Sequence, residues 1–175
     1  MLLNLKSGRI RNHPIHPVLV HVPIGFWTGV LIFDIAHLVT GSPTVAVASF
    51  YCLLGALITS IPAAIFGLVE LGFTPPATQV RRLAITHGVL NAVVVVLTLV
   101  NYVVRRSSFE GVPDGVPALA FVLTLLGYGI LGVSGYLGGK MVYEHGMGLH
   151  PEERDNGGRQ RLYPPAPRER DRDAA

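Results

Sequence analysis

Four stretches of the chain are apolar for about the length that crosses a bilayer: 18–40, 46–70, 83–104 and 116–138. A hydrocarbon core of about 30 Å requires roughly 20 such residues in a helix. The third stretch is rich in valine, but its length and its lack of period-two alternation favour a helix over a strand. The pattern predicts an all-α integral membrane protein, an up-and-down four-helix bundle over residues 18–150.

The two ends of the chain are polar. Residues 1–17 lack the apolar core of a cleavable signal peptide, so we expect them to be retained as an N-terminal cap. Residues 151–175 carry six arginines and six acidic residues and almost nothing to bury. Such a segment cannot offset the entropy lost on ordering, and we expect a disordered cytoplasmic tail.

The basic residues indicate how the bundle is oriented. Twelve of the fourteen lysines and arginines fall before the first span, between the second and third, or after the fourth. Only Arg105 and Arg106 lie on the other side. Cytoplasmic flanks carry the excess of basic residues, so both termini are predicted to be cytoplasmic, and the protein is predicted to lie in a bacterial inner membrane.

The composition excludes several classes of protein. Half of the residues are hydrophobic and 14% are charged, whereas an ordinary soluble domain has about 25% charged residues. The single cysteine, Cys52, excludes a disulfide framework and a cysteine-rich metal site. No basic patch with interleaved aromatic residues indicates nucleic acid. No nucleophile–base pair, phosphate loop or zinc-protease spacing is present, and we do not expect an enzyme.

Ionisable residues in membrane spans are costly unless they are paired, and they mark candidate sites. Three of them fall near the cytoplasmic end of the predicted bundle: His21, Glu70 and His87. Two imidazoles at similar depth on different helices are a common way to bind haem b. The sequence thus predicts axial ligation of one haem b by His21 and His87, with Asn91 and Glu70 as supporting residues. The alternative is that both histidines are wetted by lipid headgroups.

The prolines of "HPIHPVLVHVPIG" (residues 13–25) shape the start of the first span. Pro17 suits a first helical turn. Pro23 removes a backbone hydrogen bond and is expected to kink the chain near His21. His13 and His16 each precede a proline, which favours extended conformations. We expect both in the cytoplasmic cap, as surface residues or as ligands to a transient metal.

Two further features concern the other side and the fourth span. Asp34 and His37 lie three residues apart, so a local pair between them is the simplest prediction. The fourth span is rich in glycine. Gly135 and Gly139 lie one turn apart and are expected to permit close helix packing, or to leave room for a macrocycle.

Three motifs carry a family resemblance: "HPIHPVLVHVPIG", "RRLAITHGVLN" and "GYLGGKMVYEHGMGL". Over roughly residues 10–150 the chain resembles the bacterial four-helix family DUF2231, in which an Asp stands where this chain has Glu70. That family is similar in architecture to haem-binding cytochrome b561-like bundles. Its members sometimes accompany iron–sulfur or cytochrome domains, which implies a redox setting.

Three functions stay open at this level. The first is a haem-b subunit that exchanges electrons with a membrane partner. The second is a small transporter in which Asp34, Glu70 and the histidines conduct protons or metal ions. The third is a structural or assembly subunit whose polar residues hold the helices together.

Overall fold

The computed structural model describes residues 3–4, 9–10 and 13–147, with side chains from Ile15 onward. Its helices are α1 (His16–Leu19), α2 (His21–Thr40), α3 (Pro43–Gly72), α4 (Gln79–Ser108) and α5 (Ala118–Tyr143). Three two-residue strands precede them, β1 (Leu3–Asn4), β2 (Arg9–Ile10) and β3 (His13–Pro14), paired antiparallel in that order. The predicted disordered tail lies outside the described residues, as does most of the predicted N-terminal cap.

The predicted fold class is confirmed. Within residues 13–147, four helical segments are long and apolar enough to cross a membrane: His16–Thr40, Pro43–Gly72, Gln79–Ser108 and Ala118–Tyr143. The second and third have 30 residues each, which at 1.5 Å per residue is about 45 Å. Both are longer than the apolar stretches from which they were predicted: in α4 the polar ends are helical as well, and in α3 residues 43–45 and 71–72 continue the helix.

Local chemistry sets the helix ends. After α2 the chain turns at Gly41, whose φ of 66° is the left-handed conformation that favours glycine. At the start of α4 the Thr78 hydroxyl accepts a hydrogen bond from the Arg81 amide at 3.3 Å. Pro117 directly precedes α5. Tight turns of this kind make consecutive helices antiparallel.

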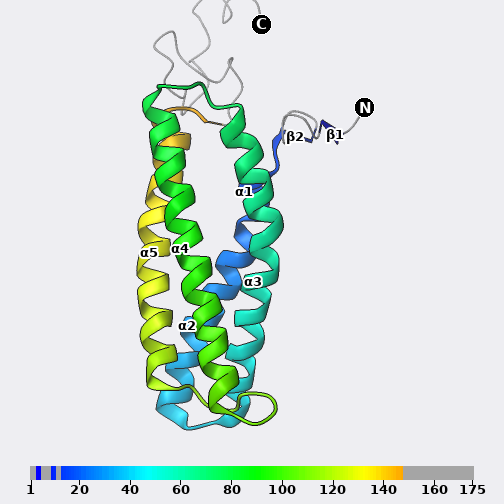
Figure 1. The fold of residues 1–175 in the computed structure, drawn as a ribbon, viewed down its shortest axis with the longest axis vertical. Coiled ribbons are helices and arrows are strands. Elements are labelled where there is room, and N and C mark those ends of the chain that lie inside the picture. The colour runs from blue at the N-terminus through cyan, green and yellow to red at the C-terminus, as the bar shows by residue number, and fades with distance from the viewer. Residues whose placement is uncertain (1–2, 5–8, 11–12, 148–175) are drawn as a thin grey trace, which may run out of the picture.

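The helices form two antiparallel hairpins, α2–α3 and α4–α5 (Figure 1). Small residues let the first pair approach closely: a Cβ at Gly29 would lie 3.0 Å from Cys52 Sγ, and one at Gly55 would lie 2.7 Å from the Phe26 ring. The buried residues of α3 recur every three or four positions, the spacing of interlocking helices; they include Ala46, Ser49, Leu53, Ala56, Ser60 and Ala63.

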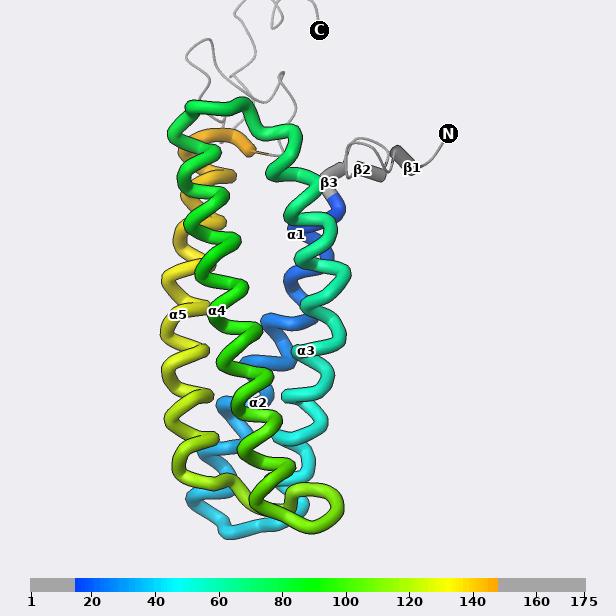
Figure 2. The backbone as a smooth tube through the Cα atoms, in the orientation of Figure 1, coloured from blue at the N-terminus to red at the C-terminus, as the bar shows by residue number. Residues whose placement is uncertain are grey.

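The two hairpins meet unevenly along the bundle. Figure 2 shows them close together at the end that holds the α2–α3 and α4–α5 connections, and farther apart toward the other end. The start of α1, the α3–α4 connection and the end of α5 share that wider end. The up-and-down arrangement thus brings the basic flanks of the spans to one side of the bundle.

The glycines of α5 do not act as predicted. Gly135 is exposed, and a Cβ added there would meet nothing within 4 Å; at Gly139 it would touch only Tyr143 of the same helix. The glycine that faces another helix is Gly138. The predicted packing role of Gly135 and Gly139 is wrong, because the spacing of residues along one helix does not give the rotation of that helix about its axis.

Candidate functional site

Two histidines from different hairpins meet at the wider end of the bundle. His16 belongs to α1 and His87 to α4, and their ring centroids lie 6.3 Å apart with the ring planes at 87°. Both side chains are half-buried. Counted from the ends of α3, α4 and α5 at this end, the residues that surround the rings lie between five and nine positions in, or about 8–13 Å. The pair is inside the bundle rather than at its rim.

Each imidazole is held by a backbone carbonyl of the neighbouring helix. His16 Nδ1 lies 2.8 Å from the Ala63 carbonyl oxygen, and His87 Nδ1 lies 2.8 Å from the Ser134 carbonyl oxygen. A carbonyl oxygen accepts and cannot donate, so both Nδ1 atoms carry the hydrogen. In the neutral rings Nε2 then keeps its lone pair, which is the form that binds a metal ion.

Glycines provide the space for the two rings. A Cβ at Gly67 of α3 would lie 3.0 Å from His16 Cε1 and 3.1 Å from its Nδ1. A Cβ at Gly138 of α5 would lie 3.4 Å from His87 Cε1. The first contact is tight enough that the imidazole would have to move if position 67 carried a side chain. The absence of a side chain at position 67 therefore favours the inward position of His16.

Asn91 and Ser134 complete the surroundings of His87. Asn91 Nδ2 lies 3.0 Å from His87 Nε2 and donates to the His87 carbonyl at 2.9 Å. The Ser134 hydroxyl lies 2.9 Å from His87 Nδ1. The contact between Asn91 and His87 was expected from the sequence, because the two residues lie four positions apart on one helix.

The structure brings His16, and not His21, to His87. His21 is exposed at the start of α2, and its side chain has no hydrogen bond or ring contact with any other described residue. The expectation that His16 lies on the surface of a cap is wrong, because α1 begins at His16 and turns its ring inward against Gly67. The side chain of His13 lies outside the described part.

Glu70 lies on α3 one turn beyond Gly67, half-buried and toward the wider end. The guanidinium of Arg81 donates to the carbonyl oxygens of Leu71 and Thr74 at 3.0 and 2.7 Å. Arg81 thereby satisfies carbonyls at and beyond the last turn of α3. A supporting role of Glu70 toward the histidine pair stays a prediction.

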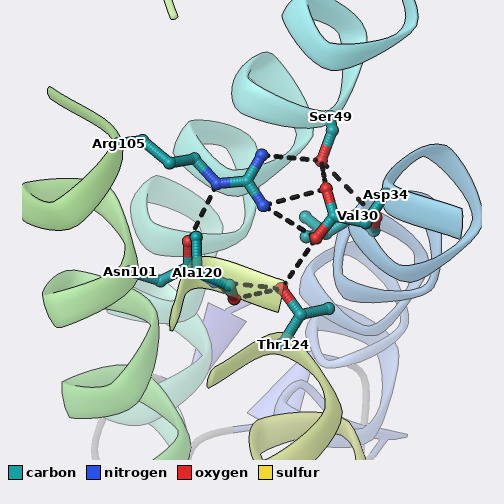
Figure 3. A network of polar contacts seen from close by, with 7 residues as sticks. All are labelled: Val30, Asp34, Ser49, Asn101, Arg105, Ala120 and Thr124. Carbon is teal, nitrogen blue, oxygen red and sulfur yellow. Dashed lines mark hydrogen bonds and ion pairs between the residues drawn. The ribbon is translucent and has the colours of Figure 1, made fainter. Parts of the chain in front are cut away.

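A second polar centre occupies the narrow end of the bundle (Figure 3). Arg105 NH2 contacts both carboxylate oxygens of Asp34, at 2.8 and 2.7 Å, and both side chains are 0% exposed. Ser49 and Thr124 donate to the same carboxylate at 2.5 and 2.8 Å. Asn101 accepts from Arg105 Nε at 2.8 Å. All four spans thus contribute to one network.

The predicted pairing of Asp34 with His37 is wrong. Asp34 points into the bundle, whereas His37 Nδ1 lies 2.9 Å from the carbonyl oxygen of Ser42 at the helix end. A guanidinium satisfies both carboxylate oxygens at once and keeps its charge. Arg105, which the sequence placed outside the membrane, is therefore the stronger partner.

A periodic signal in α4 identifies the residues that sequence reasoning missed. Positions 87, 91, 94, 98, 101 and 105 are spaced alternately by four and three, and all but Val94 are polar. Such positions share one face of a helix. The sequence predicts that His87 faces the inside of the bundle. Thr98, Asn101 and Arg105 share its helix face, so they are expected to face inward too.

Apolar side chains separate the two centres. Val30, Leu53 and Val94 are each 1% exposed. Beside them is a cavity of about 20 Å³ that is also lined by Trp27, Thr98, Asn101 and Thr124. Trp27 donates to the Thr98 hydroxyl across it at 3.0 Å. The cavity is large enough for about one water molecule, and the apolar Val94 interrupts the row of polar residues on α4 between Asn91 and Thr98.

Comparison with known proteins gives one finding. Neither a curated protein nor a solved structure matches the chain. A family model described as "Predicted membrane protein (DUF2231)" matches residues 12–151, a range that contains all four spans and both polar centres. The chain therefore belongs to the DUF2231 family of predicted membrane proteins.

Proposed function

We propose that this multi-pass membrane protein binds one haem b between its two hairpins, with His16 and His87 as the axial ligands, and exchanges electrons with a membrane partner. The observation that carries the proposal is the facing pair of imidazoles, 6.3 Å apart, each with its Nδ1 tied to a carbonyl. His16 takes the position for which the sequence suggested His21.

The separation of the rings fits ligation from opposite sides. Imidazole nitrogens bind metal ions at about 2.0–2.1 Å, so two rings on opposite faces of one ion have centroids about 6 Å apart. The observed separation is 6.3 Å. His16 and His87 would be the residues that hold the iron of a haem between them, and the distance between their rings is compatible with that role.

The position of the pair also supports the proposal. One ligand comes from the α1–α2–α3 side and the other from the α4–α5 side, where the hairpins stand apart (Figure 2). The residues beside the rings include Gly67 and Gly138, which have no side chains and so leave space for the imidazoles of His16 and His87. Haem supplies one-electron chemistry when bound; the chain's own residues hold and orient it.

Haem ligation is tested by the absorbance spectrum of the purified protein. Expression with a haem precursor and extraction into detergent is expected to give a Soret band typical of two histidine ligands. His16→Ala and His87→Ala should each abolish that spectrum, because each removes one axial nitrogen. Matched histidine variants outside the pair, His21→Ala and His37→Ala, should retain it.

Either a colourless wild-type protein or loss of the spectrum in His21→Ala alone would contradict the proposal.

A second candidate, a structural or assembly subunit, is favoured by the Asp34–Arg105 centre, which ties all four spans together. A colourless but stable protein would support this second function.

We also propose that the wider end of the bundle faces the cytoplasm of a bacterial cell. Asp34 neutralises Arg105, so Arg106 is the one uncompensated basic side chain in the described residues at the narrow end. A reporter that is active only outside the cytoplasm should be active in the loop at Glu110 and silent after residue 175. The opposite pattern would reverse the orientation.

A further inference from the structure

The cavity beside the Asp34–Arg105 centre has the size and the lining of a binding site. Its volume is about 20 Å³, and about 10–15 Å³ is enough to hold one water molecule. The helices α2, α3, α4 and α5 each contribute lining residues, and Thr98, Asn101 and Thr124 are buried polar residues among them. The polar part of the lining therefore lies in the core of the bundle.

Gly127 of α5 shows where the cavity is open. Gly127 is buried and lines the cavity, yet a Cβ added there would meet nothing within 4 Å outside the backbone of its own helix. Buried positions normally have neighbours at van der Waals distance, because protein interiors are closely packed. The space over Gly127 is thus the cavity itself, and one methyl group at this position would enter it.

The hydroxyl of Thr98 can accept one more hydrogen bond. It donates to the Val94 carbonyl oxygen at 2.7 Å and accepts from Trp27 Nε1 at 3.0 Å. A hydroxyl oxygen has two lone pairs, and the described residues use one of them here. The hydrogen of this group is occupied, but its second lone pair is not.

The contacts of Asn101 and Thr124, drawn in Figure 3, leave the same kind of group unused. Asn101 donates its two amide hydrogens to the Ala120 carbonyl at 2.9 Å and to Thr124 Oγ1 at 3.0 Å. Its Oδ1 accepts from Arg105 Nε at 2.8 Å, and the Thr124 hydroxyl donates to Asp34 at 2.8 Å. Each of these two side-chain oxygens therefore keeps one lone pair that no described residue uses.

Three oxygen lone pairs of this kind select the chemistry of the ligand. An anion would face only acceptors. A cation would be a buried charge without a counterion, because Arg105 already neutralises Asp34. A water molecule is neutral, donates two hydrogen bonds and matches the volume of the cavity.

We propose that one water molecule occupies this cavity and joins Thr98 to Asn101 and Thr124 as a structural part of the bundle core. It donates one hydrogen to Thr98 and the other to Asn101 or Thr124. The contact between Trp27 and Thr98 is thereby connected to the Asp34–Arg105 centre. The inference goes beyond the proposed function and does not depend on haem.

The test compares the stability of Gly127→Ala with that of Gly129→Ala. Gly129 is exposed on the same helix, and a Cβ there also meets nothing within 4 Å. In Gly129→Ala, the better helix propensity of alanine should favour the folded state by about fivefold. Gly127→Ala displaces the water and its hydrogen bonds, so its folding equilibrium should be roughly tenfold less favourable than that of Gly129→Ala. Reversible unfolding in mixed detergent micelles measures both.

The same pair of variants supplies the result that would overturn the inference. If the cavity binds no water, the added methyl group fills apolar space and removes part of a void. Gly127→Ala would then be as stable as Gly129→Ala or more stable.

A second readout detects the water directly. Trp27 is the only tryptophan of the chain, so its indole N–H gives a single NMR resonance. In haem-free wild type this hydrogen should show a rotating-frame Overhauser cross-peak to water, because both bind the Thr98 oxygen. Gly129→Ala should keep the cross-peak and Gly127→Ala should lose it. A cross-peak that is missing from wild type, or that persists in Gly127→Ala, would overturn the inference and leave the histidine pair unaffected.

Discussion

Replacing Asp34 with leucine should lower the free energy of unfolding by about 3–5 kcal/mol, the usual cost of removing one partner from a buried ion pair. Arg105 is 0% exposed, and its remaining contacts are hydrogen bonds to Ser49 and Asn101 at 3.2 and 2.8 Å. Neither of these partners carries a charge, so the guanidinium would stay buried without a counterion. Reversible unfolding in mixed detergent micelles measures the loss.

The double variant Asp34→Leu/Arg105→Leu separates the ion pair from the cost of an uncompensated charge. A buried pair replaced by apolar residues is often neutral in stability. Ser49, Asn101 and Thr124 each keep a hydrogen bond to a backbone carbonyl, so the double variant should regain most of the loss. The matched control is Arg106→Leu, an exposed arginine next in sequence, which should change stability little. An Asp34→Leu protein as stable as wild type would show that the ion pair is dispensable.

Gly67→Val should abolish haem binding by removing the space in which His16 lies. A Cβ at this position would be 3.0 Å from His16 Cε1, and the two methyl groups of valine extend farther. The imidazole would have to leave its hydrogen bond to Ala63, and one axial nitrogen would be lost with it. The absorbance spectrum after haem loading measures this effect.

Two controls distinguish displacement of His16 from a general effect of valine on the stability of the protein. Gly72 ends the same helix, and a Cβ there meets nothing within 4 Å, so Gly72→Val should load haem as wild type does. If Gly67→Val is unstable because valine and the imidazole overlap, adding His16→Ala should restore stability without restoring haem binding. Normal haem loading by Gly67→Val would exclude His16 as a ligand.

The two polar centres lie at opposite ends of the bundle. The Asp34–Arg105 centre joins all four spans at the narrow end, and each of its charged groups has several partners. The histidine pair is at the wider end, where the hairpins stand apart (Figure 2). The network at the narrow end therefore joins the two hairpins where they lie close together.

The sequence by itself determined the features that depend on neighbouring residues. The apolar lengths and the lack of alternation predicted the four helices, since a bilayer requires a fixed number of apolar residues with satisfied backbone groups. The four-residue spacing on α4 predicted that Asn91 contacts His87, because residues so spaced share a helix face. The stripe from His87 to Arg105 was readable in the same way.

Only the tertiary structure decided which residues meet across helices. His16 and His87 are 71 positions apart in the chain, and so are Asp34 and Arg105. Helical periodicity gives the face on which a residue lies, but neither the rotation of that helix in the bundle nor its shift along a distant neighbour. The path of the chain before Pro17 turned His16 inward and left His21 outside. His16 is held in its inward position by packing against Gly67 and by a hydrogen bond to the carbonyl of Ala63, both of which are distant in sequence.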